Sequence, residues 1–224
     1  MLLRKILSRS PLAPRVVPFV IFLLLTFGQG QFGPASAYWF YLAKTVVGVW
    51  LIIETWPLVP EMRWAFSWEA VAVGLGVLVM WIGIDPLYPK LALAKVTVEN
   101  SNPNLVFGQH SPLACFFLLV HILGMTVVVP PLEEVFWRSF MYRFIAKPEF
   151  LEVPLNRFLP FPFIATAVVF GLEHSQWLAG ILCGLAYQWL VLRKNRIGDA
   201  MTAHAITNFL LGVWVVWQGA WNFW

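Results

Sequence analysis

Charged residues are scarce in this chain of 224 residues, where Asp, Glu, Lys and Arg together make up only 12%. Soluble domains carry about twice that fraction, so the composition argues against a water-soluble protein. The 60% hydrophobic content and the mean hydropathy of +0.74 instead predict an integral membrane protein. Its 13 tryptophans fit this prediction, because tryptophan collects at membrane interfaces. The net charge of +4 is modest and lies mostly in connecting segments, so it gives no case for a nucleic-acid partner.

Cysteine is also rare, and several catalytic signatures are missing. Cys115 and Cys183 lie in apolar segments without CxxC spacing, which argues against a disulfide framework or a thiolate metal site. No HExxH motif is present, so the usual zinc-protease ligands are missing. The two aspartates, Asp85 and Asp199, fall at helix ends and do not suggest an aspartyl dyad. Ser175 lacks the glycine-flanked turn that a rhomboid-like nucleophile needs.

Apolar runs of helical length organise the chain. They cover residues 16–27, 38–56, 68–84, 113–129, 161–172, 177–192 and 200–217, and a further helix is predicted from near Pro131 to about Ile145. The sequence therefore predicts an all-α, multi-pass transmembrane bundle of about eight helices, forming a single membrane domain over residues 1–224. Gly74 and Gly76 suit a close approach between helices.

The ends of the apolar runs leave two questions open. The basic start of the chain predicts a cytoplasmic amino terminus, with a signal peptide as the alternative. Strict alternation of eight spans then puts the basic cluster Arg193–Arg196 outside, against the positive-inside tendency. One segment is therefore re-entrant or one span is miscounted, with the helix of Glu133 or the segment near Phe161 as the candidates. Residues 90–96 predict a short amphipathic helix at the bilayer surface.

The stretch from Pro130 to Arg138 places two adjacent carboxylates and a guanidinium within an apolar region. Ionised side chains at that depth are costly unless they pair or face a polar cavity, so they indicate a functional site. The two prolines predict that a helix starts near Pro131, which puts Glu133 and Glu134 in a first turn that favours anions. Glu134 and Arg138 are then i,i+4 neighbours and can pair. The alternative is that both glutamates only complement the helix end.

Three further polar residues recur in the next apolar segments. His174 closes one of them, while His204 and Asn208 project from one face of another. Interhelical hydrogen bonding is the alternative for such residues. If folding brings them to the two glutamates, they form one buried polar site around a water-sized space.

Such a site has the parts of a hydrolase. Glu133 could act as general base toward a water that His174 holds. His204 and Asn208 could donate hydrogen bonds to the oxyanion of a tetrahedral intermediate. Arg138 would orient Glu134 and lock the helix, so Glu134 and Arg138 are expected to support the site.

The three motifs, Glu133-Glu134-x-x-x-Arg138, Phe170-x-x-x-His174 and His204-x-x-x-Asn208, resemble those of the CAAX prenyl protease type II family of intramembrane glutamate proteases (the Rce1-like, CPBP or Abi proteins). The similarity covers residues 113–217, which the resemblance identifies as the catalytic core. It implies an eight-helix fold in which Glu133 and His174 activate water while His204 and Asn208 stabilise the oxyanion. The aromatic-rich first half also resembles the CAAX protease-related proteins that accompany bacterial exosortase systems.

The resulting prediction is a metal-independent intramembrane endopeptidase without cofactor, located in a prokaryotic plasma membrane. Its substrate would be a protein or peptide that is membrane-anchored or lipid-modified. One alternative is a non-proteolytic membrane scaffold or immunity protein of the same fold. Another is a haem or metal protein that uses His121, His174 and His204, or a zinc site in which Glu133 joins His174 and His204.

Overall fold

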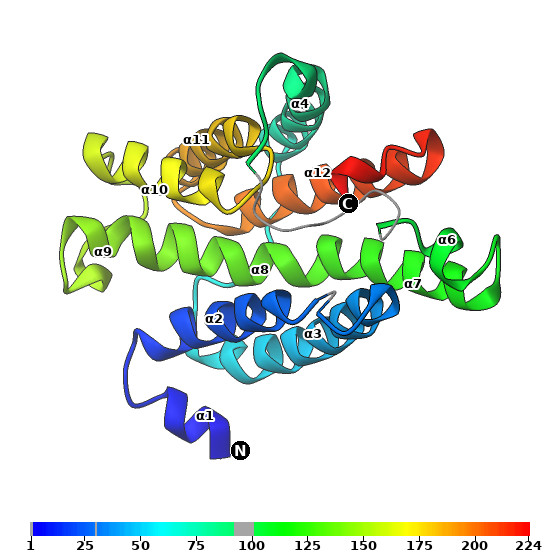
Figure 1. Ribbon diagram of the computed structural model, residues 1–224. Helices are drawn as coiled ribbons and strands as arrows, with labels where there is room; N and C mark the ends of the chain where they lie inside the picture. The colour runs from blue at the N-terminus through cyan, green and yellow to red at the C-terminus, as the bar shows by residue number, and fades with distance from the viewer. Residues whose placement is uncertain (1, 30, 92–100) are drawn as a thin grey trace. The chain divides into compact units, whose positions relative to one another are not determined.

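A computed structural model describes residues 2–29, 31–91 and 101–224, and these residues form helices joined by short turns, with no β-strand among them (Figure 1). The helices are α1 (Leu2–Leu7), α2 (Ala13–Phe27), α3 (Pro34–Thr55), α4 (Trp68–Ile84), α6 (Pro103–Phe107), α7 (Pro112–Leu123), α8 (Val129–Glu134), α9 (Tyr142–Ala146), α10 (Pro160–Leu172), α11 (Trp177–Lys194) and α12 (Gly198–Gln218). The predicted all-α fold is confirmed.

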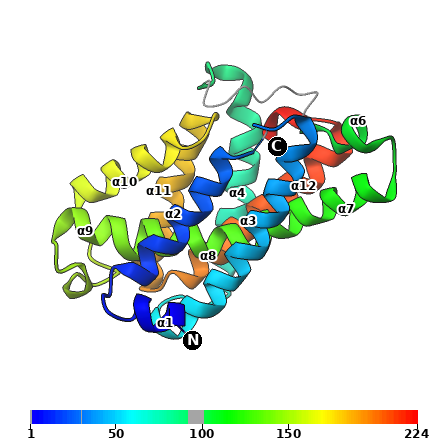
Figure 2. The same cartoon turned by 60° about the horizontal axis from the view of Figure 1, so that its bottom comes forward.

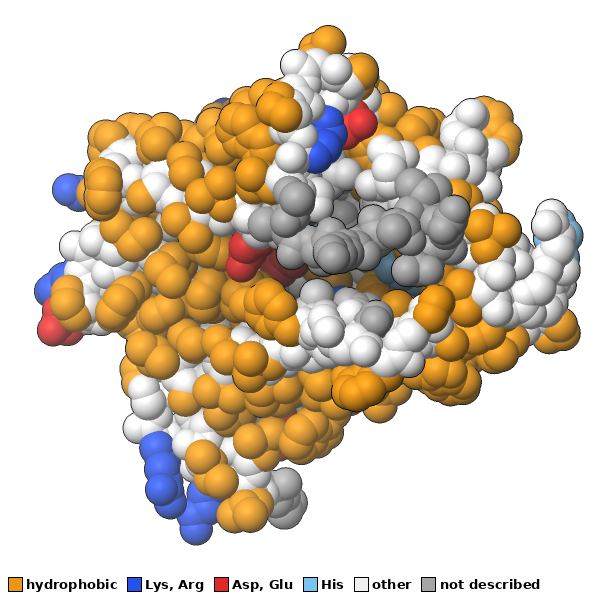
Figure 3. Space-filling view, viewed as in Figure 1, with side chains coloured by type: hydrophobic (Ala, Val, Ile, Leu, Met, Phe, Trp, Pro, Cys, Tyr) orange, Lys and Arg blue, Asp and Glu red, His pale blue; other side chains and the backbone are white. Residues whose placement is uncertain are grey.

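Four helical stretches are long and apolar enough to cross a membrane: Pro34–Leu58, Trp68–Leu87, Pro112–Ala146 and Gly198–Gln218. Helices α2 and α10 are apolar but shorter. Large apolar side chains point outward from these helices, and hydrophobic atoms cover most of the face seen in Figure 3. Such a surface is costly in water and favourable in lipid, so the protein is an integral membrane protein. Of the predicted amphipathic segment 90–96, residues 92–96 lie outside the described residues.

The prediction that a helix starts near Pro131 is wrong. Helices α7, α8 and α9 are one continuous helix, Pro112–Ala146, and Pro130 and Pro131 lie inside it (Figure 1). A proline removes a backbone donor, but a π-helical turn at Gly124–Val128 precedes the pair, and the Val129 N–H reaches the Gly124 carbonyl there. Membrane helices tolerate proline by such local π adjustments. The runs 113–129 and 131–145 therefore form one candidate span instead of two, which is the kind of miscount that the Arg193–Arg196 conflict indicated.

The chain divides into two compact units. The first unit comprises residues 1–58, 95–132 and 208–224, and the second comprises residues 59–94 and 133–207.

In the first unit, α2 and α3 run side by side (Figure 2). Phe22 packs there with Val128 and Leu132 in a small hydrophobic cluster. Lys44 is buried on α3, and its Nζ donates to Thr26 Oγ1 at 3.1 Å and to Gln29 Oε1 at 3.2 Å. Hydrogen bonds of this kind offset the cost of a buried ammonium group in an apolar helix.

His121 also lies in the first unit, on α7. Its ring is stacked on those of Tyr41 and Trp224, with centroids 4.0 Å away in each case, and the Tyr41 hydroxyl donates to the His121 carbonyl. His121 thus links α7 to α3.

In the second unit, α10 and α11 form a tight pair, and α11 also packs on α4. A Cβ at Gly180 would lie 2.8 Å from Gly171 Cα, so only glycine permits this approach. Gly74 on α4 makes the predicted close contact, since a Cβ there would lie 2.7 Å from the Ala203 carbonyl. The same prediction for Gly76 is wrong, because no atom of the described residues would lie within 4 Å of a Cβ there.

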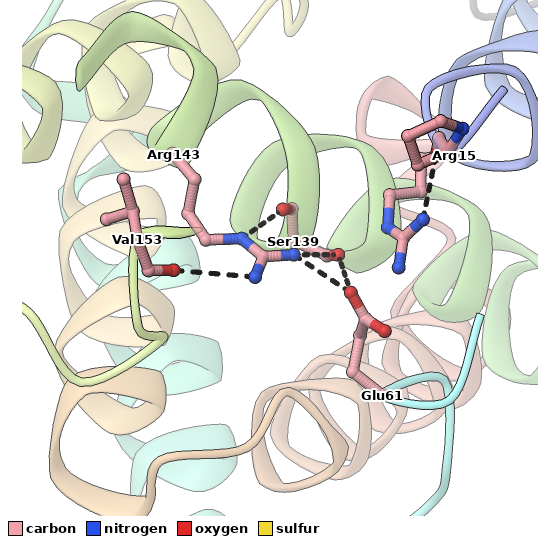
Figure 4. A network of polar contacts seen from close by, with 6 residues as sticks. Arg15, Glu61, Ser139, Arg143 and Val153 are labelled. Atoms are coloured by element: carbon pink, nitrogen blue, oxygen red, sulfur yellow. Dashed lines mark hydrogen bonds and ion pairs between the residues drawn. The ribbon is translucent and has the colours of Figure 1, made fainter. Parts of the chain in front are cut away.

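A polar network fastens the loop before α4 to the helix that carries Arg143 (Figure 4). The Glu61 carboxylate accepts hydrogen bonds from Ser139 Oγ and from Arg143 Nη2, the latter at 2.9 Å. Arg143 also donates to the backbone carbonyls of Ser139 and Val153. Both Ser139 and Arg143 are buried, so this network replaces the water that their polar groups lose on folding.

Candidate active site

Glu133 and Glu134 lie in the middle of the helix Pro112–Ala146, at the end of α8 and directly before a second π-helical turn, Val135–Met141. The predicted stabilisation by a helix start therefore does not apply, because the macrodipole acts only near the ends. Other side chains must therefore offset the cost of burying the two carboxyl groups. Single π turns within α-helices are frequent at functional sites.

Glu134 is fully buried and has two charged or polar partners. Arg138 Nε lies 3.1 Å from its Oε2, as the i,i+4 spacing predicted. His204 Nδ1 on α12 lies 2.9 Å from its Oε1. A carboxylate oxygen only accepts, so the His204 Nδ1 carries a proton and its Nε2 points away from Glu134. The contact with His204 was not predicted, since no local spacing relates two residues 70 positions apart.

Arg138 is itself buried, with an exposed fraction of 2%. Its guanidinium lies 4.5 Å from the centre of the Phe170 ring and 5.8 Å from that of Tyr187. Within the described ranges, its Nη1 and Nη2 have no hydrogen-bond acceptor. The aromatic faces and the Glu134 carboxylate thus stabilise the cation.

Glu133 makes none of the contacts that hold Glu134. Its Oε2 is buried, and no hydrogen-bond partner for it is found among residues 2–29, 31–91 and 101–224. Glu133 is the residue before Glu134 in the same helix and therefore lies next to the Glu134 cluster. A buried carboxyl oxygen with unused acceptor capacity is suited to hold a water or a substrate N–H.

His174 lies in the turn between α10 and α11, outside the long apolar helices. Its Nδ1 lies 2.9 Å from the Phe170 carbonyl, so Nδ1 is the donor and Nε2 is left as an acceptor. Burial lowers the pKa of His174 to about 4, and the nearby His204 and Arg138 act in the same direction against this hydrogen bond. The ring is therefore neutral at pH 7. No direct hydrogen bond joins it to Glu133 within the part of the chain that the structure describes.

Asn208 lies on α12 one helical turn after His204, and the division into compact units falls directly before it. It belongs to the first compact unit, whereas Glu133, Glu134, Arg138, His174 and His204 belong to the second. Its Nδ2 donates to the Met125 carbonyl at 2.7 Å, in the π-helical turn that precedes the two prolines. This contact is of the interhelical kind that the sequence left open as the alternative role.

Two residues of the site were missed. Tyr187 on α11 is stacked on the His204 ring, and its hydroxyl donates to Thr207 on α12. No sequence signal separates Tyr187 from the other aromatics of this chain, and the only signal at Thr207 is its position next to Asn208. Among the described residues, no three His, Cys, Asp or Glu side chains are placed to hold a metal ion together.

Similarity to known proteins covers part of the chain. Residues 115–210 match the family described as type II CAAX prenyl endopeptidase Rce1-like, which confirms the resemblance that the three motifs predicted. A segment of 89 residues is 34% identical to a Heme A synthase of Paramagnetospirillum magneticum (strain ATCC 700264 / AMB-1), covering 38% of this chain and 24% of that protein. The chain thus matches only about a quarter of the length of that curated relative. No solved structure matches the chain.

Proposed function

Since residues 115–210 are Rce1-like, we propose that this protein is an intramembrane endopeptidase in which Glu133 activates water without a metal ion. The observation that carries the proposal is the ordered set of contacts around Glu134. This carboxylate fixes Arg138 on one oxygen and His204 on the other, directly beside a second carboxyl group with an unused buried oxygen. Ion pairs at membrane depth are retained where function needs them.

In the proposed reaction, a water molecule lies between Glu133 and His174. Glu133 takes one of its protons, while the other stays on the water oxygen and forms a hydrogen bond to Nε2 of the neutral His174. The oxygen of the water attacks the carbonyl carbon of the peptide bond, and the carbonyl oxygen becomes an oxyanion. Glu133 then returns its proton to the leaving nitrogen as the carbon–nitrogen bond breaks, so that a carboxylic acid and an amine are formed.

The oxyanion is stabilised by His204 and Asn208 in this proposal. With its Nδ1–H given to Glu134, His204 offers an Nε2–H to the oxyanion in the form of the ring that carries both protons. The amide nitrogen of Asn208 carries two hydrogens, of which one is used by Met125, so one remains for the oxyanion. One such donor contributes roughly 3 to 4 kcal/mol to catalysis in hydrolases.

The substrate is proposed to be a protein or peptide of the membrane, since the site residues lie within or beside apolar helices. Lipid-modified chains fit the name of the matching family, and a prokaryotic plasma membrane remains the proposed location. A scaffold or immunity protein of the same fold is the alternative that lacks proteolysis.

Comparison of cell-surface and secreted peptides tests the proposal. Cells would express wild type, Glu133→Gln or the control Glu149→Gln, which alters an exposed carboxylate with an exposed fraction of 61%. We expect one or more peptides to disappear in Glu133→Gln while Glu149→Gln leaves them unchanged. Identical peptide sets and an intact cellular phenotype in Glu133→Gln would instead support the scaffold.

A haem-binding protein is a second candidate. It is favoured by the partial similarity to Heme A synthase and by the Nδ1 contacts of His174 and His204, because metal-ligating histidines donate their other ring N–H to such oxygens. Visible absorption of the protein purified from haem-replete cells decides this question. A haem band that His204→Ala removes would support the second candidate, and a colourless sample would exclude it.

A further inference from the structure

Tyr187 occupies a central position that none of the sequence motifs includes. It is fully buried on α11, and its ring is stacked on that of His204 with 5.2 Å between centroids and 30° between planes. The contact covers one face of the imidazole. Offset stacking of this kind restricts rotation of both rings.

The hydroxyl of Tyr187 is anchored at its far end. It donates to Thr207 Oγ1 at 2.8 Å, and that oxygen lies 2.9 Å from the Gly74 carbonyl and 3.0 Å from the Ala203 carbonyl. All four residues belong to the second compact unit. The tyrosine ring is therefore held through Thr207 to α4 and α12, and a ring held in this way restricts the side chains that pack against it.

Both partners of Glu134 lie near the Tyr187 ring. His204 is stacked on the ring, and the Arg138 guanidinium lies 5.8 Å from its centre. Glu134 holds Arg138 with one oxygen and His204 with the other. One aromatic side chain thus limits the movement of both groups that the buried carboxylate pairs with.

We propose that Tyr187 is a positioning residue of the site, whose ring holds His204 in the orientation that gives Nδ1 to Glu134 and leaves Nε2 for a substrate oxygen. The catalytic meaning of this orientation rests on the proposed function. The orientation itself does not, so it can be measured without a substrate.

Exchange of the histidine C2 hydrogen for deuterium, followed by mass spectrometry of the purified full-length protein in micelles, tests the proposal. The four histidines report separately, and His110 in its exposed loop and His174 serve as internal references. The variants are Tyr187→Leu, which removes the ring, and Tyr187→Phe, which keeps it. Tyr142→Leu is the matched control, because Tyr142 is equally buried in the same unit and its hydroxyl bonds Arg157 and Leu159 instead.

We expect Tyr187→Leu to accelerate exchange at His204 by about five-fold or more, because one ring face becomes free to open locally. Exchange at His174 and His110 should stay within about two-fold of wild type. Tyr187→Phe keeps the ring but lacks the hydroxyl that bonds Thr207, so it should accelerate exchange at His204 less than Tyr187→Leu, by about two- to five-fold. Should Tyr187→Leu fail to fold, Thr207→Val takes its place, since it keeps the ring but removes its anchor. That variant is expected to accelerate hydrogen exchange at His204 by about two- to five-fold.

Unchanged exchange at His204 in these variants would overturn the proposal. So would equal acceleration at His174, or the same acceleration in Tyr142→Leu, because either result would mean that Tyr187 only fills space. If Glu133→Gln retains every peptide product while His204 responds to Tyr187 as expected, the proposed function fails and the positioning role stands.

Discussion

Replacing Arg138 by methionine tests whether the buried ion pair holds the site together. The substitution keeps most of the side-chain volume but leaves the Glu134 carboxylate, which has an exposed fraction of 0%, without its cation. Breaking a buried pair by removing one partner costs about 3–5 kcal/mol, since a charge stays buried without compensation. A protein of this size loses roughly 2–4 °C in Tm per kcal/mol, so Tm should fall by about 6–20 °C.

The assay is thermal unfolding in micelles, followed by tryptophan fluorescence. Arg193→Met is the control, because Arg193 is 58% exposed and lies 3.9 Å from Glu69, a surface pair worth at most about 1 kcal/mol. In the double variant Glu134→Gln with Arg138→Met, the decrease in stability should be smaller than the sum of the decreases in the two single variants, since both charges are removed. The reasoning is refuted if Arg138→Met unfolds within a few degrees of wild type, or if the two losses simply add.

Further outcomes follow from the helix contacts and from His174. Gly74→Val should lower Tm strongly, because a Cβ at this position would lie 2.7 Å from the Ala203 carbonyl. Gly76→Val should leave Tm unchanged, since a Cβ there meets no described atom within 4 Å. Equal changes of Tm in the two variants, measured in the same melting assay, would contradict the helix packing. The pKa of His174 falls from 6.5 to about 4 on folding, so the unfolded chain binds more protons between these values, and stability should decline as the pH is lowered from 6.5 toward 4. His174→Gln should show a smaller decline over this range when both are unfolded at each pH, and parallel curves would assign the acid sensitivity to other groups.

Much of the helical framework could be predicted from the sequence. Helix α4 was predicted at 68–84 and is found at Trp68–Ile84. The prediction succeeds because the length of an apolar run bounded by polar residues sets where a membrane helix begins and ends. The pairing of Glu134 with Arg138 follows from local helical geometry in the same way. The error at Pro131 has a different origin. A proline pair ends most helices, and the π-helical turn that accommodates it here depends on backbone bonds that composition does not encode.

The candidate site shows the same division between local and long-range information. The residue types at 133, 134, 138, 174 and 204 marked the costly polar groups, but which of them would meet depended on packing. Glu134 and His204 lie on different helices, and the Tyr187 ring that contacts His204 comes from a third. Asn208 donates to Met125, a contact that its spacing from His204 gives no reason to expect.

The role of Glu133 in activating water is the central claim, and its most direct test is a rate. Single-turnover cleavage of the client peptide identified by the peptide comparison would be measured for wild type and for folded Glu133→Gln protein with the same Tm. Loss of a general base lowers the rate by roughly 10²–10⁴-fold, and the account predicts a loss in this range. A Glu133→Gln rate within about tenfold of wild type would lie below that range and contradict the account.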